Sequence, residues 1–305
     1  MRIGLSGGAT TIERMIEQVV EAERGGFSSM WFAGAIGTDP LIVLPLAGRA
    51  TSTIELGTSV VQTYPRHPVL MAQQAAAVAL AIGGDAPRFT LGVGVSHRPV
   101  IESYGLDYER RAEHLDEYLH IVGSLLDEGK VRFSGTEYRC AADLRNRPPV
   151  RVPVLAAALG PKALASTGAH ADGTITWMAN RKAIESHVGP RLTKAAADAG
   201  RPAPRIVVGL PVAVCDDVDA GRDAAAQQFA MYGTLPNYQR ILAKGGVTSP
   251  ADAAIVGPED EVEREIRALL DSAATDYWAA IFPVGEDRRG SRQRTHALLQ
   301  SLASA

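Results

Sequence analysis

Short apolar segments alternate along this chain with longer stretches in which apolar residues recur every three or four positions. The short segments predict buried strands and the longer stretches predict amphipathic helices. Residues 90–95 and 154–158 are small or branched and apolar without polar alternation, which is typical of parallel strands covered on both faces. The predicted strands are 2–5, 29–32, 54–61, 88–93, 152–156, 173–177, 205–214 and 277–282.

The helical stretches fall between these strands, so strand and helix alternate along the chain. Eight strands joined by helices predict an α/β fold of the (β/α)8 TIM barrel type, in one domain over residues 1–305. A minimal barrel needs about 250 residues, which leaves room for insertions at about 130–149 and 234–254, both candidate substrate lids. The predicted helices are 11–24, 40–51, 68–82, 108–127, 161–169, 181–199, 219–231 and 258–272.

A doubly wound open sheet would also produce alternating strands and helices, and it stays open as an alternative. The usual dinucleotide fingerprint of that fold has three glycines in the pattern GxGxxG. This chain has Gly92 and Gly94 but places His97 where the third glycine would stand. The pattern therefore favours the barrel.

Composition narrows the class of partner. The 305 residues carry a net charge of −3, and no block of lysine and arginine stands out, which argues against nucleic acid or an anionic membrane and favours a small-molecule substrate. No signal peptide and no apolar run of about 18 residues is visible, so a cytoplasmic protein is expected. Cys140 and Cys215 have no CxxC spacing, and the seven histidines form no HxH or HExxH pattern, so no metal site is predicted.

Catalytic and binding groups of a barrel come from the carboxyl ends of its strands. Ser6 and Gly7 follow the first strand, where small residues leave room for a flat ligand or serve only as turn residues. The third strand ends in Ser59, Val60 and Gln62 and continues with several polar residues, a density that predicts the lining of a site. The alternative is a capped loop before the helix that begins near residue 68.

The fourth strand places His97 just past two glycines, where an imidazole can act as a general acid or base near neutral pH. The alternative is a surface loop histidine. After the sixth strand, Trp177 can stack on a ring system or pack in the core, and the sequence does not decide between them.

The fifth strand is followed by Leu159, Gly160, Pro161 and Lys162, a turn that opens a helix. The free N–H groups of the first helical turn, the helix dipole and the lysine ammonium together predict an anion site, most naturally for phosphate. A lysine in a first turn opposes the helix dipole, which favours this functional interpretation over a purely structural one.

These strand ends, taken in order, resemble the bacterial luciferase-like monooxygenase superfamily, and most closely its branch that uses the deazaflavin coenzyme F420. The resemblance covers residues 1 to about 180 and returns at 278–282. Each motif is weak alone, and the ordered set carries the resemblance: 57–60 with 66–68, 88–94, 152–162 and 171–173.

The resemblance implies a barrel that binds F420 at its mouth. Ser59 and Val60 would be joined by a non-prolyl cis peptide bond that backs the deazaflavin ring, Gly94, Val95 and Ser96 would lie along the cofactor's side chain, and residues 159–161 would hold its phosphate. His97 occupies the place where the related sugar-phosphate dehydrogenases carry an acidic catalytic residue.

The chain also departs from those dehydrogenases. They carry an Asp-His pair and a tryptophan after the second strand, whereas residues 32–35 here read Phe-Ala-Gly-Ala, which argues against glucose 6-phosphate oxidation. The first hypothesis is an F420-dependent oxidoreductase that moves a hydride between C5 of the deazaflavin and a small organic substrate. An FMN-dependent luciferase-like monooxygenase and a non-catalytic flavin- or deazaflavin-binding protein are the alternatives. The resemblance also suggests a homodimer, and the alanine-rich stretch 72–81 could pack against a second subunit or within the core.

Overall fold

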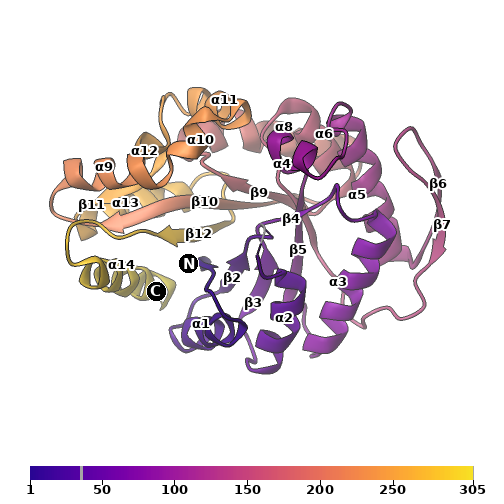
Figure 1. The fold of residues 1–305 in the computed structure, drawn as a ribbon, viewed down its shortest axis with the longest axis horizontal. Helices are drawn as coiled ribbons and strands as arrows, with labels where there is room; N and C mark the ends of the chain where they lie inside the picture. Colours follow the sequence, from indigo (N-terminus) through magenta and orange to yellow (C-terminus); the bar gives the residue numbers. More distant parts are fainter. Residues whose placement is uncertain (35–36, 305) are drawn as a thin grey trace.

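A closed parallel barrel forms the centre of the computed structural model, which describes residues 1–34 and 37–304 (Figure 1). Within these residues, β12 pairs with β1 and β10 pairs with β9, so the sheet closes on itself and the open-sheet alternative is wrong. The predicted barrel is confirmed. Its strands are β1 Ile3–Gly7, β2 Ser29–Phe32, β3 Glu55–Thr58, β5 Phe89–Gly94, β8 Val154–Ala156, β9 Gly173–Trp177, β10 Arg205–Val214 and β12 Asp276–Ile281.

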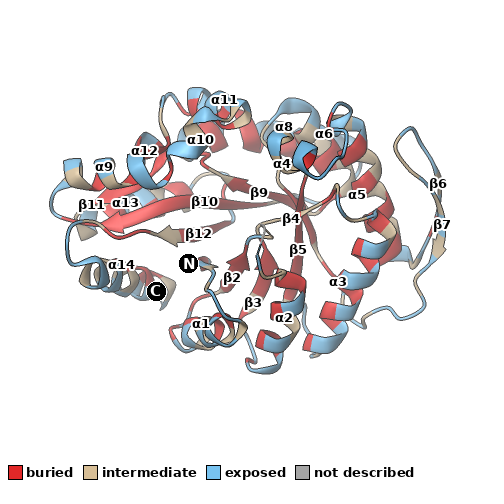
Figure 2. Ribbon diagram, in the orientation of Figure 1, coloured by how far each residue is buried: buried red, intermediate tan, exposed pale blue. Residues whose placement is uncertain are grey.

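Helices surround the barrel, with their apolar sides toward the strands and their polar sides toward solvent (Figure 2). Several of these helices begin at residues that favour a helix start. Thr11 caps the first helix through its hydroxyl, Asp39 caps the second through its carboxylate, and proline opens the third at Pro68. The main outer helices are α1 Ile12–Arg24, α2 Pro40–Arg49, α3 Pro68–Ile82, α5 Arg111–Glu128, α6 Pro161–His170, α8 Gly189–Asp198, α9 Val218–Gln228, α13 Glu259–Leu270 and α14 Arg288–Ser304.

Three predicted segments are divided in the structure. The strand 54–61 is β3 followed by the short β4 Val61–Gln62, because the chain turns at Ser59 and Val60. The helix 181–199 comprises α7 Arg181–Ala183, a π-helical turn and α8, and the helix 219–231 ends at Gln228 before α10 Ala230–Thr234. The π-helical turn is Ile184–Val188.

Two helices lie outside both the predicted helices and the predicted insertions. The short α4 Arg98–Ser103 follows β5 directly, and α14 closes the described chain. Only Thr295, Leu299 and Leu302 of α14 are buried, so its apolar stripe is too narrow to stand out in the sequence.

The two predicted insertions have different structures. Residues 130–149 contain a hairpin, β6 Lys130–Ser134 and β7 Arg139–Asp143, which packs beside α5 at the edge of the molecule (Figure 1). Residues 234–254 are rich in glycine, proline and polar residues, yet they hold α11 Pro236–Lys244 and α12 Pro250–Ala253. These helices are followed by β11 Ile255–Gly257, which pairs with β10. Both helices start with proline, which suits a first helical position.

Three large side chains fill the middle of the barrel because neighbouring strands carry glycine. Trp31, Trp278 and Ile175 belong to one buried cluster inside the barrel. A Cβ at Gly57 would lie 2.2 Å from the Trp31 ring, and a Cβ at Gly209 would lie 2.0 Å from the Trp278 ring. Glycine at these positions therefore makes room for the indoles.

Ion pairs close the amino-terminal end of the barrel beneath this cluster. Arg205 of β10 reaches across to Glu55 of β3 at 2.6 Å and also binds Asp276 of β12 at 2.6 Å. Arg2 contacts the same two carboxylates from the solvent side. In barrels of this type the carboxyl ends of the strands carry the binding and catalytic groups, and we call that opposite end the mouth.

Candidate active site

The turn after β3 has the geometry that the resemblance implied. The Ser59–Val60 peptide bond is cis. The chain packs closely against β5 here: a Cβ at Gly92 would lie 1.9 Å from the Thr58 carbonyl oxygen, and a Cβ at Gly94 would lie 2.6 Å from Val60 Cγ2. Glycine at 92 and 94 is therefore required for the turn to approach β5, and the side chain of Val60 stays partly exposed at the mouth.

Ser96 is bonded to one predicted site residue, Gln62, and to Tyr108, which the sequence did not indicate. Its φ of 63° lies in the left-handed region, which is uncommon for a residue other than glycine. Gln62 Nε2 donates to Ser96 Oγ at 3.1 Å, and the Tyr108 hydroxyl donates to the Ser96 carbonyl oxygen at 2.7 Å. The ends of β4 and β5 are thus tied together at the predicted cofactor side chain, beside Val95.

His97 directly follows Ser96 in the chain. It is the N-cap residue of α4, but its side chain makes no capping bond, and its ring has no hydrogen-bond partner within residues 1–34 and 37–304. Burial lowers the pKa of His97 from its usual 6.5, so the imidazole is neutral at pH 7. A neutral, half-buried ring can both accept and donate a proton.

The amino terminus of α6 fits an anion. Gly160 is its N-cap residue and supplies no capping side chain, so the N–H groups of Lys162 and Ala163 have no acceptor in the described part of the chain. A Cβ at Gly160 would meet nothing within 4 Å, so the approach is open. The exposed Lys162 adds a positive charge, and Pro161 fixes the first helical turn.

Leu159, the residue before Gly160, is held in place through its carbonyl oxygen. His187, on the π-helical turn after β9, contacts the Leu159 carbonyl oxygen through Nε2 at 2.8 Å. This contact fixes the entry into the anion site. This helix terminus could hold a phosphate, and the Val60 turn could hold the ring of a flat cofactor.

Trp177 lies in a group of aromatic residues at the end of β9. Its ring stacks on Trp278 with centroids 5.2 Å apart, and Gly209 on the strand between them leaves the space for this contact. Phe229 and Tyr232 meet its edge at 5.9 and 5.6 Å. Trp177 is therefore half-buried among aromatic side chains rather than standing free at the mouth.

Tyr238 of α11 extends this group to His97, with the two ring centroids 5.7 Å apart. We call Trp177, Phe229, Tyr232 and Tyr238 the aromatic wall. Figure 1 shows its helices α10 and α11 at the same end of the molecule as α4. No sequence pattern indicates Phe229, Tyr232 or Tyr238 as site residues, although Tyr238 lies in the predicted lid 234–254.

The remaining two predicted site residues, Ser6 and Gly7, lie at the end of β1. Ser6 is exposed at the end of β1, and a Cβ at Gly7 would lie 2.4 Å from the Phe32 ring, so that glycine is needed for packing. His67 Nδ1 accepts a hydrogen bond from the Val69 N–H and caps α3, as the structural alternative for that loop expected. Ala35 falls outside the described residues.

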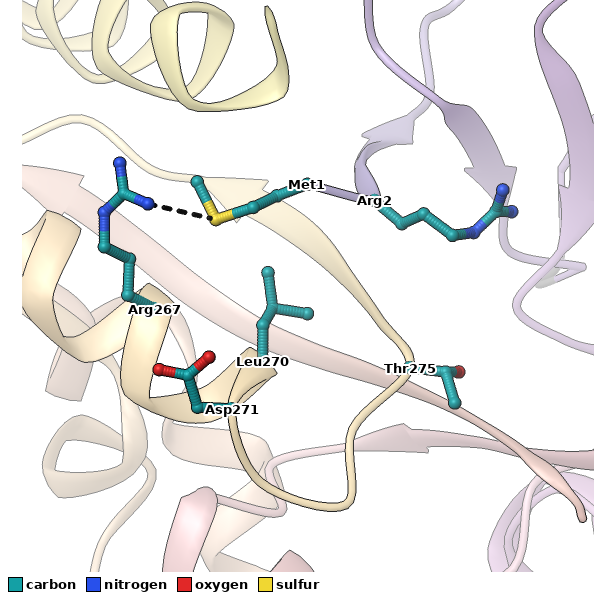
Figure 3. Close-up of a pocket in the computed structure, with 6 residues that line it drawn as sticks. All are labelled: Met1, Arg2, Arg267, Leu270, Asp271 and Thr275. Carbon is teal, nitrogen blue, oxygen red and sulfur yellow. Dashed lines mark hydrogen bonds between the residues drawn. The ribbon is translucent and has the colours of Figure 1, made fainter. Parts of the chain in front are cut away.

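A pocket of about 290 Å³ lies at the other end of the barrel (Figure 3). Met1, Arg2 and Thr275 line it near the starts of β1 and β12. In barrels of this type the amino-terminal end contributes stability and the carboxyl end contributes catalysis, so this pocket is not the candidate active site. The other residues that line it are Arg267, Leu270 and Asp271.

Across 1–34 and 37–304, no three histidine, cysteine, aspartate or glutamate side chains gather as metal ligands. Over the same ranges, no helix combines the length and apolar character needed to cross a bilayer.

Known proteins resemble this chain over most of its length. F420-dependent glucose-6-phosphate dehydrogenase of Beutenbergia cavernae is 29% identical over 288 residues, 90% of this chain and 80% of that protein. Coenzyme F420-dependent tetrahydromethanopterin reductase of Methanopyrus kandleri superposes with a TM-score of 0.78 at 20% identity, covering 99% of this chain and 97% of that one. The oxygenating constituent of 3,6-diketocamphane monooxygenase of Pseudomonas putida, solved with FMN, superposes with a TM-score of 0.73 at 15% identity, covering 99% and 96%.

At these identities the two solved structures show the same fold and no more. The family assignment comes from the sequence as a whole, since the family model described as luciferase-like monooxygenase matches residues 1–303. The chain therefore belongs to the luciferase-like monooxygenase family and is an oxidoreductase of that family.

Proposed function

We propose that this protein is a coenzyme F420-dependent oxidoreductase that transfers a hydride between the deazaflavin C5 and a small organic substrate. The observation that carries the proposal is the pairing of the Val60 turn, packed against β5, with an uncapped helix terminus at Gly160. The first offers a partly exposed apolar surface for a ring, and the second offers N–H groups for a phosphate. The F420 dependence of the Beutenbergia cavernae relative supports the same cofactor.

In this proposal, different residues of the chain bind different parts of the cofactor. Val60 backs the ring, while Gly94, Val95 and Ser96 follow the cofactor's side chain, with Gln62 holding Ser96. The α6 terminus with Leu159, Gly160, Pro161 and Lys162 binds the phosphate. Ser6 and Gly7 border the mouth, and Trp177 closes it through the aromatic wall. When bound, a deazaflavin supplies two-electron hydride chemistry.

His97 is proposed as the catalytic acid or base. Its pKa, lowered by burial, keeps the imidazole neutral, so its free ring nitrogen can accept the proton of a substrate hydroxyl and its N–H can return a proton to a substrate oxygen. The aromatic wall packs against His97 through Tyr238 and limits the access of water to the ring.

The test is a fluorescence titration of the purified protein with coenzyme F420, beside FMN in the same buffer. Micromolar binding of F420 with no binding of FMN supports the proposal. A preference for FMN would replace it with the monooxygenase alternative, and binding of neither would contradict both.

We also propose that the protein is a cytoplasmic homodimer. The helices α2 and α3 contact each other and leave large apolar side chains exposed: Ile42 at 57%, Leu46 at 47% and Leu70 at 54%. A second copy of this face would bury them. Light scattering should give twice the chain mass, and Leu46→Asp should give a monomer. A monomeric wild-type protein would contradict the dimer.

A further inference from the structure

The side chain of His187 makes one hydrogen bond, to the loop that precedes α6. The residue is 5% exposed, and its Nε2 lies 2.8 Å from the Leu159 carbonyl oxygen. The other ring nitrogen, Nδ1, is buried and has no partner in the part of the chain that the structure describes. Because a carbonyl oxygen can only accept, Nε2 carries the ring proton and donates it to Leu159.

A π-helical turn sets the position of His187 beside the start of α6. In this turn the Gly189 N–H bonds to the Ile184 carbonyl oxygen, five residues earlier. The next residue, Pro190, has no N–H group and cannot continue the regular helical pattern. The following helix α8 packs against α6 (Figure 1). Turns of this kind are frequent at functional sites because they change the direction of a side chain.

The bond from His187 fixes the orientation of the peptide between Leu159 and Gly160. This peptide is trans, since Ser59–Val60 is the only cis bond among the described residues. In a trans peptide the C=O and N–H groups point in opposite directions. The Gly160 N–H therefore points away from His187, and it has no acceptor in residues 1–34 and 37–304.

Glycine at position 160 gives this peptide a second accessible orientation. The φ of Gly160 is −90°. Rotating the peptide by half a turn would bring this φ to about +90°, which glycine adopts readily and other residues disfavour. The Leu159 carbonyl oxygen would then take the place of the Gly160 N–H. Because a carbonyl oxygen repels an anion, the rotation would replace a donor of the anion site with a repulsive group.

His187 holds the Leu159 carbonyl in its neutral form. Burial lowers the pKa of His187 from its usual 6.5, and Arg191 and Lys244 lower it further, although the bond to Leu159 acts in the opposite direction. The ring is therefore neutral at pH 7 with its proton on Nε2. Its effect on a bound anion comes from the orientation of the peptide rather than from a charge of its own.

We propose that His187 is a positioning residue of the anion site at α6. By holding the Leu159 carbonyl oxygen, it keeps the Gly160 N–H turned toward the ligand. That N–H then joins those of Lys162 and Ala163, which also lack acceptors in the described chain. The ligand group is a phosphate or another tetrahedral oxyanion, which backbone N–H groups at a helix start bind well. This inference rests on the proposed function only for the identity of the cofactor that carries the phosphate.

The test separates ligands that carry the anion from a ligand that lacks it. Isothermal titration calorimetry of the full chain measures the affinity for F420, for the same deazaflavin without its phosphate, and for sulfate. His187→Leu should weaken the binding of F420 and sulfate about fivefold, as expected for one lost hydrogen bond, and leave the phosphate-free deazaflavin unchanged. An equal loss for all three ligands, or unchanged sulfate binding, would overturn the proposal.

Two further variants separate the positioning role from a general effect on folding. His187→Gln keeps an N–H donor for the Leu159 carbonyl and should restore most of the affinity for sulfate. Ser186→Ala is the matched control, since Ser186 is exposed on the same turn and its hydroxyl bonds only to the Lys182 carbonyl oxygen among the described residues. It should leave all three affinities unchanged. A sulfate affinity as weak in His187→Gln as in His187→Leu would contradict a role for the N–H donor.

A double-mutant cycle tests the peptide orientation itself. Gly160→Ala is tolerated, because its Cβ would meet nothing within 4 Å and a φ of −90° suits alanine. Alanine disfavours the rotated peptide whether or not His187 is present. His187→Leu should therefore weaken sulfate binding about fivefold with glycine at 160, but less than about twofold in the Gly160→Ala background. Equal losses in both backgrounds would overturn the proposal.

The outcomes distinguish this inference from the proposed function. Sulfate binding that depends on His187, in a protein that binds no F420, would support the positioning role and contradict the cofactor. F420 binding that is unchanged in His187→Leu would support the cofactor and contradict the positioning role. A wild-type protein that binds neither sulfate nor F420 would contradict both.

Discussion

The Tyr108 hydroxyl donates a 2.7 Å hydrogen bond to the carbonyl oxygen of Ser96, the residue that directly precedes His97. Ser96 has a left-handed backbone, which costs energy in any residue with a side chain and persists only where neighbours hold it. Tyr108 and Gln62 are the neighbours that do so, one through the backbone and one through the side chain. The position of the His97 ring therefore depends on a phenol outside the strand that carries it.

Tyr108→Phe should reduce turnover while leaving F420 affinity nearly unchanged, because it removes the bond to Ser96 and keeps the ring. Loss of one hydrogen bond is worth about 1 kcal/mol, so a fall in kcat of roughly fivefold is expected. Tyr104→Phe is the control, since Tyr104 lies at the end of α4 and is 37% exposed. Equal kcat values for Tyr108→Phe and the wild type would show that Ser96 keeps its position without this bond.

The pH profile tests His97 directly. Its pKa lies below 6.5 because of burial, so the neutral ring predominates throughout the neutral range. If His97 is the base, kcat/KM should be flat above pH 6.5 and should fall below it, as the ring takes up a proton. His97→Ala should bind F420 normally, lose most turnover and lose this acidic limb. A variant that retains the limb would assign it to another group.

The anion site at α6 makes a separate prediction for cofactor binding. Lys162→Ala should weaken F420 binding by about three- to tenfold, since one exposed cation near a phosphate contributes about 1 kcal/mol. Lys194→Ala is the control, because Lys194 is also exposed but pairs with Asp198 on α8. The difference should shrink as salt is added, since salt screens exposed charges. Equal affinities in the two variants would contradict a phosphate at this terminus.

The strand ends could be predicted from sequence because a parallel barrel brings successive carboxyl ends to one mouth. Ser59, Gly94, His97 and Gly160 each stand at such an end, so their shared location follows from the alternation of strands and helices. The number and order of the barrel strands could be predicted for the same reason.

The aromatic wall could not be predicted in this way. Tyr238 meets His97 only because α11 folds back over the mouth, and no periodic pattern links the two positions. The segment that carries Tyr238 is rich in glycine and proline, which indicates a loop, whereas its prolines begin helices. Tyr108 was assigned to a helix that in fact begins at Arg111, so its contact with Ser96 had no signal in the sequence.

The ion pairs at the closed end of the barrel make a stability prediction. Burial alone would raise the pKa of Asp276, but hydrogen bonds from Arg205 hold it below its usual value. Arg205→Met should leave Glu55 and Asp276 without their buried partner and cost about 3 to 5 kcal/mol in the free energy of unfolding. Arg2→Met removes a guanidinium from the same carboxylates but at a site 52% exposed, and should cost less than about 1 kcal/mol. Urea denaturation of both variants measures the difference, and equal costs would show that the two arginines are interchangeable.

A buried histidine outside the mouth predicts how stability depends on pH. His114 of α5 is 4% exposed, stacks on Tyr64 with centroids 3.8 Å apart, and contacts the Thr63 hydroxyl through Nε2 at 2.8 Å and the Tyr138 hydroxyl through Nδ1 at 3.1 Å. It therefore ties the loop after β4 and the tip of the hairpin to one helix. Burial lowers the pKa of His114 from 6.5 to about 4.

Between these two pKa values the unfolded chain binds a proton at His114 and the folded chain does not, so the free energy of unfolding should fall as the pH drops from 6.5 toward 4. The loss attributable to His114 is about 2 kcal/mol between pH 7.5 and pH 5. His114→Gln keeps a polar side chain that does not titrate. Over this interval, its free energy of unfolding should therefore fall by about 2 kcal/mol less than that of the wild type. Urea denaturation of both proteins at the two pH values measures the difference, which also subtracts the contribution of carboxylates common to both. Identical losses in the two proteins would mean that His114 is already protonated, or equally accessible, in the folded state.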